Sequence, residues 1–346
     1  METKIKQIAG RFNIDEVIGT SRFGNGLIND TYLVQCHKNK FVLQKLHPIL
    51  KSSVLIDTHY ITKQLSDNGL ITPLLVKTKN GKLFFKSDKK DCWRMLTYIP
   101  GKCYEGGISP KQAFSAGRLV GQFHNILAGS DYKFRHKIKN FHDSETRIDK
   151  LKAVLKRFRR NLKYNDLIGP ASVVLKNYSG LGDKIESCPN RVIHGDLKIN
   201  NIRFNFKNDA VCLLDLDTLG RHKVTTDIAA GARTWCNKAE EGDIENAEFD
   251  LEVFGSMLNG YLSTAKFITK KEIEAIPETV ERVILTLIAR FITDAFEEKY
   301  FRLNPNQYKN LYQQNKTRAL AQLALYNDFM DKKESINKII KKLCKL

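Results

Sequence analysis

The sequence predicts an α+β protein of two lobes, a small antiparallel sheet followed by a larger, mainly helical part. Up to about residue 98 the chain carries short apolar runs with strand-like alternation and one helical stretch. Pro100-Gly101, a pair that commonly separates elements, then interrupts this pattern, and the rest is mostly helical apart from one hairpin. We expect lobes at residues 1–99 and 100–346, and a chain of 346 residues is long enough for two cores.

The elements expected in the first lobe follow from local signals. Pro48 ends a strand because proline lacks the N–H that a strand donates, and Asn80-Gly81 is a strong turn dipeptide. A serine before an apolar periodic stretch marks a helix start, and Asn-Gly marks its end. The expected order is a hairpin of strands at 32–35 and 41–46, a helix from Ser52 or Ser53 to near Asn68-Gly69, a strand pair at 74–76 and 83–85, and a strand at 93–99.

The most informative segment lies in the second lobe and begins with His194-Gly195-Asp196. Asn201 follows five residues after Asp196, and Asp215 follows nineteen after it. Residues 202–206 and 211–214 read as two short strands around a turn at Asn208-Asp209. This hairpin would carry Asn201 at one end and Asp215 at the other.

This spacing is that of the H-x-D-x-x-x-x-N loop of phosphoryl-transfer enzymes, followed by a strand that delivers a metal-binding aspartate. Asp196 can accept the proton of an attacking hydroxyl. Asn201 and Asp215 can hold Mg²⁺ against the phosphates of ATP, because a hard cation prefers oxygen ligands. A single H-x-D is often an ordinary turn, but four polar residues at this spacing favour a bilobal protein-kinase-like fold and a kinase.

A phosphate-binding loop is expected at Gly24-Asn25-Gly26, just before the hairpin of the first lobe. Two glycines let the backbone approach phosphates closely and turn its N–H groups toward them. The third glycine of a protein-kinase loop is absent, and Asn29 stands in its place. An ordinary turn between strands explains a lone Gly-x-Gly equally well.

The lysine that would contact the phosphates is ambiguous in the sequence. The pattern of the strand places the functional position at Gln44, whereas Lys45 is the only cation there, and neighbouring strand residues point to opposite faces. We favour Lys45, with a surface lysine as the alternative. The adenine is expected against the strand that includes Thr97 and Ile99.

Composition narrows the possible partners. The net charge of +19 could attract nucleic acid or membrane phosphates, and basic residues cluster at 147–163 and from 331 to the end. In both stretches apolar residues recur at helical spacing, which favours amphipathic helices with solvated basic faces. Aromatic residues do not alternate with the charges, so a nucleic-acid partner is not expected. The charge also argues mildly against a cationic substrate.

Cysteine usage and hydropathy indicate the compartment. Seven cysteines are scattered without a C-x-x-C pair, which is typical of reduced thiols. No run approaches the roughly 20 apolar residues of a membrane span, and the first residues lack the layout of a secretory signal. We expect a cytoplasmic protein without a transmembrane segment. The sequence does not indicate an oligomeric state.

These residues resemble the aminoglycoside phosphotransferase and choline kinase superfamily. Several stretches are similar in particular to N-acetylhexosamine 1-kinases and related sugar kinases, and the similarity runs from about residue 15 to 330. The stretches that carry it are 26–32, 42–45, 93–95, 121–124, 140–143, 198–201, 215–218, Asp227 and 290–294.

The resemblance implies roles for further residues. Asp196 would be the base near the anomeric hydroxyl of a sugar, and Asp227 a buried anchor for the catalytic segment. Asp217, Arg233 and Arg290 are the candidate contacts to the acceptor or its phosphate. An aspartate in such a position can instead cap a helix or pair with an arginine such as Arg233.

One departure from the subgroup concerns the acceptor. The subgroup commonly has a histidine where this chain has Leu27, and leucine cannot donate a hydrogen bond to a hydroxyl. A small polar acceptor, preferably a sugar or amino sugar, remains the expectation. The alternatives are choline, an aminoglycoside or a hydroxylated amino acid as acceptor, or an ATP-binding module without catalysis.

Overall fold

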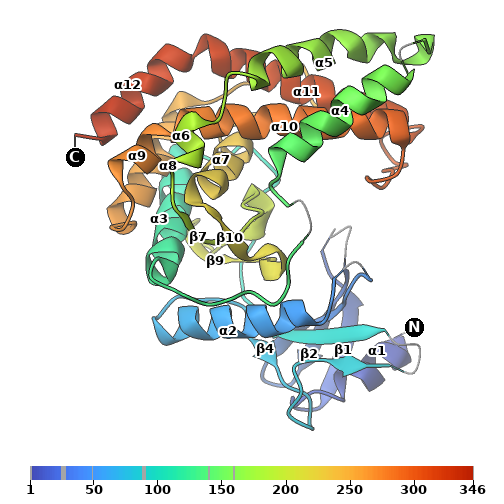
Figure 1. Ribbon diagram of the computed structural model, residues 1–346. Helices are drawn as coiled ribbons and strands as arrows, with labels where there is room; N and C mark the ends of the chain where they lie inside the picture. The colour runs from blue at the N-terminus through green and yellow to red at the C-terminus, as the bar shows by residue number, and fades with distance from the viewer. Residues whose placement is uncertain are drawn as a thin grey trace.

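The computed structural model has two lobes stacked one above the other, with the N-terminal sheet below and the helical lobe above in Figure 1. It describes residues 2–24, 29–48, 50–87, 91–138, 141–158 and 160–345. The expected small antiparallel sheet followed by a mainly helical part is confirmed.

The first lobe is one antiparallel sheet with two helices. Its elements are α1 (Glu2–Ala9), β1 (Val17–Arg22), β2 (Asp30–Cys36), β3 (Lys40–Lys45), α2 (Ser53–Asp67), β4 (Leu75–Val76), β5 (Phe85–Lys86) and β6 (Cys92–Thr97). The strand order is β1-β2-β3-β6-β4, and β5 also pairs with β6. The predicted hairpin, the helix after Ser52 and the strand near 93–99 are confirmed, whereas α1 and β1 were not expected from the sequence.

The expected pairing of 74–76 with 83–85 is wrong. Both short strands pair with β6 instead, β4 opposite Met95 and Leu96 and β5 opposite Cys92 and Trp93. The turn at Asn80-Gly81 does form, with the Gly81 N–H donating to the Thr78 carbonyl at 2.8 Å. Strand β3 pairs with one edge of β6, and the other edge is long enough for both β4 and β5. The turn therefore connects two strands that lie one after the other along β6.

The second lobe is mainly helical. Its elements are α3 (Pro110–Leu127), α4 (Ser144–Phe158), η1 (Leu162–Tyr164), α5 (Asn165–Tyr178), α6 (Asp183–Glu186), β7 (Asn190–Ile193), η2 (Ile199–Asn201), β8 (Ile202–Phe204), β9 (Ala210–Leu213), η3 (Leu216–Thr218), β10 (Gly220–Lys223), α7 (Val224–Trp235), α8 (Leu251–Thr264), α9 (Lys270–Glu274), α10 (Ile276–Glu297), α11 (Leu311–Asp331) and α12 (Lys333–Leu343).

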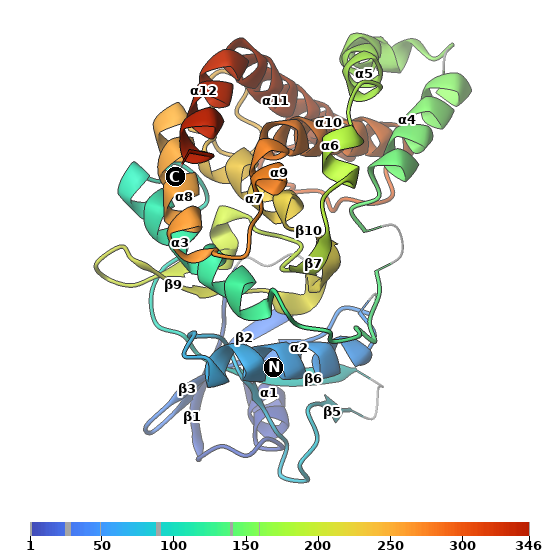
Figure 2. The same ribbon diagram turned by 60° about the vertical axis from the view of Figure 1, so that its left-hand side comes forward.

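Helix α10 forms the centre of this lobe and packs against α4, α7 and α11. The strands β7–β10 lie on the side of the lobe that faces the sheet, as Figure 2 shows from a second direction. The two lobes have separate cores, but Ile61 and Leu65 of α2 belong to the core of the helical lobe. Helix α2 therefore connects the lobes through packing as well as through the chain.

The two basic stretches form helices with buried apolar stripes. Helix α4 ends at Phe158, so Leu162, which we expected on the same stripe, lies outside the helix with 80 % of its surface exposed. Helix α12 buries Ile336, Ile340 and Leu343 against the helical lobe. No described helix is long and apolar enough to cross a membrane.

Candidate active site

The catalytic loop is held in place by one buried carboxylate. Asp227, in the first turn of α7, accepts hydrogen bonds from the backbone N–H groups of His194 at 2.6 Å and Gly195 at 2.8 Å, and from His124 Nε2 at 3.0 Å. Gly195 has a positive φ of 88°, and a Cβ there would lie 2.5 Å from the Thr218 carbonyl oxygen. The role of Asp227 as a buried anchor is confirmed by these contacts.

His194 links this loop to the hairpin of β8 and β9. Its Nε2 donates to the Leu214 carbonyl at 2.8 Å, so its Nδ1 is the atom that accepts from the Asp196 N–H at 3.3 Å. Burial lowers the pKa of His194, which keeps the ring neutral and this tautomer in place. The histidine of the motif is therefore a positioning residue for Asp196.

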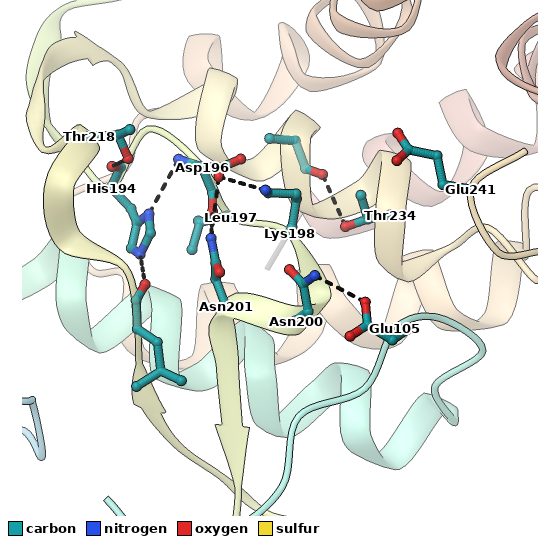
Figure 3. A network of polar contacts seen from close by, with 12 residues as sticks. Glu105, His194, Asp196, Leu197, Lys198, Asn200, Asn201, Thr218, Thr234 and Glu241 are labelled. Atoms are coloured by element: carbon teal, nitrogen blue, oxygen red, sulfur yellow. Dashed lines mark hydrogen bonds and ion pairs between the residues drawn. The ribbon is translucent and has the colours of Figure 1, made fainter. Parts of the chain in front are cut away.

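Asp196 lies between His194, Lys198 and Asn201 in this network, as Figure 3 shows. Its Oδ2 is 2.9 Å from Lys198 Nζ and 3.4 Å from Asn201 Nδ2, and Asn201 Nδ2 also donates to the Asp196 carbonyl at 2.8 Å. Burial acts to lower the pKa of Lys198, but the adjacent Asp196 raises it. Lys198 lies in a stretch quoted for the resemblance, yet the sequence did not indicate this ion pair.

The metal candidates lie at the two ends of one hairpin, as the sequence predicts. Asn201 directly precedes β8, Asp215 follows β9 by one residue, and the Leu214 N–H donates to the Asn201 carbonyl at 2.8 Å. Asp215 adopts a left-handed backbone with a φ of 58°. This unusual conformation is typical of residues that a functional site holds in place.

Asp215 is exposed to solvent, yet protein atoms surround its carboxylate closely. Burial and the neighbouring carboxylates of Asp217 and Asp196 raise its pKa to about 7. Within the part of the chain that the structure describes, its side chain has no hydrogen bond or ion pair. Lys198 and Arg94 offset part of this negative charge, and a divalent metal ion at Asp215 would offset more of it.

A buried ion pair joins the lobes beside these residues. Arg94, on β6, donates to both carboxylate oxygens of Asp217, with 2.8 Å between its second terminal nitrogen and Asp217 Oδ2. Gln44 Oε1 accepts from Arg94 Nε at 2.8 Å, and Asn29 Nδ2 donates to Asp217 at 3.2 Å. Asp217 thus pairs with Arg94, not with Arg233, and its oxygens are already engaged within the protein.

The register of the sheet bears on the choice between Gln44 and Lys45. Gln44 lies opposite Arg94 and shares its face, which is directed at the second lobe. Lys45 lies opposite Trp93, and its Nζ is 3.0 Å from Asp91. This arrangement does not favour Lys45 as a phosphate ligand. The cation on the face toward Asp215 is Arg94, which we did not select from the sequence.

The structure describes part of the region where we expect the nucleotide. Asn25, Gly26 and Leu27 lie outside the described residues, and Gly24 has a positive φ of 74°. Phe23 packs edge-on against Tyr98 with ring centroids 5.9 Å apart, so this loop begins beside the strand proposed for adenine. On that strand Thr97 Oγ1 accepts from the Leu74 N–H at 2.9 Å, and Ile99 is half-buried.

The other two acceptor candidates lie on helices of the second lobe. Arg233, on α7, donates to Gln322 at 3.3 Å, and Arg290, on α10, donates to the Tyr300 hydroxyl at 3.2 Å. The charges of Asp196 and Arg290 both act on Arg233. The two arginines therefore lie near each other, and Arg233 lies near Asp196.

Comparison with solved structures places this fold among small-molecule kinases. An aminoglycoside phosphotransferase from Alicyclobacillus acidocaldarius matches with a TM-score of 0.66 and 13% identity, over 95% of this chain and 96% of the other. An amicoumacin kinase matches with a TM-score of 0.63 and 14% identity, over 99% and 97%. A choline kinase from Cryptosporidium parvum matches with a TM-score of 0.54 and 15% identity, over 99% and 98%. At these identities the similarity establishes the fold.

A family model provides the assignment. The model described as the phosphotransferase enzyme family, APH, matches residues 19–258, which include the catalytic loop, the hairpin and Asp227. The resemblance to the aminoglycoside phosphotransferase and choline kinase superfamily is thereby confirmed at the level of the family, whereas the hexosamine-kinase subgroup stays a prediction. The chain belongs to the phosphotransferase enzyme family.

Proposed function

We propose that this phosphotransferase transfers the γ-phosphoryl group of ATP to a hydroxyl of a small polar acceptor, preferably a sugar or amino sugar. The observation that carries the proposal is the convergence of Asp196, Asn201 and Asp215 on one loop and hairpin. Similar solved structures support the donor: the amicoumacin kinase was solved with AMP-PNP and Ca²⁺, and an aminoglycoside phosphotransferase with ADP.

The residues present fit a divalent cation, for which we propose Mg²⁺. Asp215 brings a carboxylate without a partner among the described residues, and the side-chain oxygen of Asn201 remains for a metal because its Nδ2 is turned to Asp196. No described cluster of three or more His, Cys, Asp or Glu side chains could hold an ion. A cation bound by Asn201 and Asp215 would share its other positions with phosphate oxygens and would offset their charge.

The chain's own residues would position and deprotonate the acceptor. Asp196 would accept the proton of the attacking hydroxyl, and Lys198, 2.9 Å away, would orient that carboxylate until the acceptor binds. Asp227 and His194 fix the loop without contact to the reacting atoms. Phosphoryl transfer depends mostly on such positioning and on charge, so few groups are needed.

The direct test is a screen for acceptor-dependent ADP release from ATP with Mg²⁺. The acceptors are free sugars, amino sugars, choline, aminoglycosides and hydroxylated amino acids. Asp196→Asn should lower turnover by about a thousandfold and leave ATP binding nearly unchanged. Asp149→Asn, an exposed aspartate on α4, is the matched control and should behave as wild type. Turnover in Asp196→Asn equal to wild type would refute the assigned base.

A further inference from the structure

We propose that the acceptor carries an anionic oxygen group, a phosphate or a carboxylate, and that an arginine cluster binds it beside Asp196. The cluster consists of Arg147, Arg233, Arg290 and Arg318, from α4, α7, α10 and α11. The inference rests on the proposed phosphotransfer and specifies the chemical class of its acceptor.

Arg233 lies near the catalytic loop, because the charge of Asp196 acts on it. Helix α7 packs on that loop, where Trp235 Nε1 donates to the Leu197 carbonyl at 3.2 Å. Arg233 is half-buried, and its described hydrogen bond is the one to the neutral Gln322 at 3.3 Å. No described carboxylate lies within ion-pair distance of it, although a guanidinium has five N–H donors.

Arg290 and Arg318 both lie against one aromatic ring, that of Phe301. Their guanidinium carbons lie 5.7 and 4.7 Å from the centre of the Phe301 ring, and Arg318 also lies 4.2 Å from the centre of Phe291. Arg318 is neutralised by Glu241 at 2.8 Å. Arg290 has the Tyr300 hydroxyl and no described ion pair. Stacking fixes the position of a guanidinium and leaves its edge for hydrogen bonds.

The charges of the cluster oppose one another. Burial, and then the positive charge of Arg290, lowers the pKa of Arg147. Burial lowers the pKa of Arg233 as well; the carboxylates of Glu241 and Asp196 oppose this effect, and Arg290 and Arg318 add to it. Repulsion between half-buried cations is unfavourable unless a counter-charge is supplied. A bound anion would supply it.

Arg233 and Arg290 have no acidic ion-pair partner among the described residues. Glu241 is paired with Arg318, and Asp196 is paired with Lys198. A phosphate or carboxylate suits a planar guanidinium because two parallel N–H···O bonds can form. A cationic acceptor such as choline would instead meet like charges, which select strongly against it.

The first experiment uses inorganic phosphate as the probe. Calorimetric titration into the full-length protein, with AMP-PNP and Mg²⁺ at saturation to fill the nucleotide site, should show binding in the millimolar range or tighter. Arg233→Gln and Arg290→Gln should each weaken it by about tenfold or more, since each removes a charge-assisted hydrogen bond. Arg118→Gln, an exposed arginine on α3, should bind as wild type.

The second experiment compares kcat/KM for N-acetylglucosamine, its 6-phosphate and glucosamine. The phosphate ester should be preferred by at least tenfold, and Arg233→Gln and Arg290→Gln should remove the preference while thermal unfolding shows that they remain folded. Preference for the neutral or the amine sugar, or phosphate binding that both variants leave unchanged, overturns the inference and leaves the phosphotransfer proposal standing. Absence of ADP release with every acceptor, despite normal phosphate binding, would instead count against the phosphotransfer.

Discussion

Arg94 and Asp217 form a buried ion pair between the lobes. Both side chains are almost fully buried, and the two residues are 123 positions apart in the sequence. Arg94→Met should lower the free energy of unfolding by about 3 to 5 kcal/mol, because it leaves the Asp217 carboxylate buried without its partner. Urea denaturation measures the change.

The double variant Arg94→Met, Asp217→Leu is the matched control, because it removes both charges. It should regain much of the lost stability. A single variant that unfolds at the same urea concentration as wild type would show that the pair contributes little.

His142 predicts a pH dependence of stability. Burial, and then the charge of His222, lowers the pKa of His142 to about 4, and its Nε2 is buried without a partner. Since the folded pKa is below the unfolded value near 6.5, the unfolded state binds more protons between pH 6.5 and 4. Stability should therefore fall as the pH is lowered through this window.

The test compares Tm at pH 7 and pH 5 for wild type and His142→Asn, because asparagine tolerates the φ of 57° at this position. The decrease should be smaller in the variant. Burial also lowers the pKa values of His194 and His222, so part of the decrease should persist. Equal decreases in both proteins would contradict the role of His142.

The sequence was sufficient to identify the candidate site residues that are recognised by their spacing along the chain. Asp196, Asn201 and Asp215 stand at fixed offsets, and the hairpin that joins them needs only a turn at Asn208, which has a φ of 64°. Arg94 and Lys198 carry no such local signal. Their roles depend on partners that folding brings close. The sequence alone therefore offered Gln44 and Lys45, and not Arg94, as candidates for the contact to the phosphates.

At the level of elements, the contact between α3 and α8 depends on glycines. A Cβ on Gly260 would overlap the Phe114 carbonyl, and one on Gly117 would overlap the Met257 carbonyl. Gly260→Ala should therefore destabilise the protein by roughly 1 to 3 kcal/mol, because the helices must separate. Thermal unfolding measures the change.

Gly255 on the same helix provides the control, since a Cβ there meets nothing within 4 Å. Gly255→Ala should stabilise the protein by about 0.5 to 1 kcal/mol through helix propensity. If Gly260→Ala were as stable as Gly255→Ala, the close approach of α3 and α8 would not be as described.

Elements were predictable where their partners are adjacent in sequence. The β2–β3 and β8–β9 hairpins follow from alternation and a turn. The pairing of β4 and β5 does not, because two-residue strands carry little pattern and both take the free edge of β6. The packing of α12 agrees with its apolar stripe, which the sequence shows.

At the scale of the whole molecule, the candidate active site draws on both lobes. The sheet contributes Arg94 and the loop that begins at Gly24, and the helical lobe contributes the catalytic loop and hairpin. The net charge of +19 is partly explained by the solvated faces of α4 and α12, and by the arginine cluster beside Asp196. The resemblance covered both lobes, but their relative placement became visible only in the structure.

The most direct test of the central claim is the effect of Mg²⁺ on AMP-PNP affinity, measured by calorimetry for wild type, Asp196→Asn and Asp215→Asn. Wild type and Asp196→Asn should bind the nucleotide at least about tenfold more tightly with Mg²⁺, whereas Asp215→Asn should lose this gain because one carboxylate ligand is gone. An Asp215→Asn variant that keeps the full Mg²⁺-dependent gain would contradict the account.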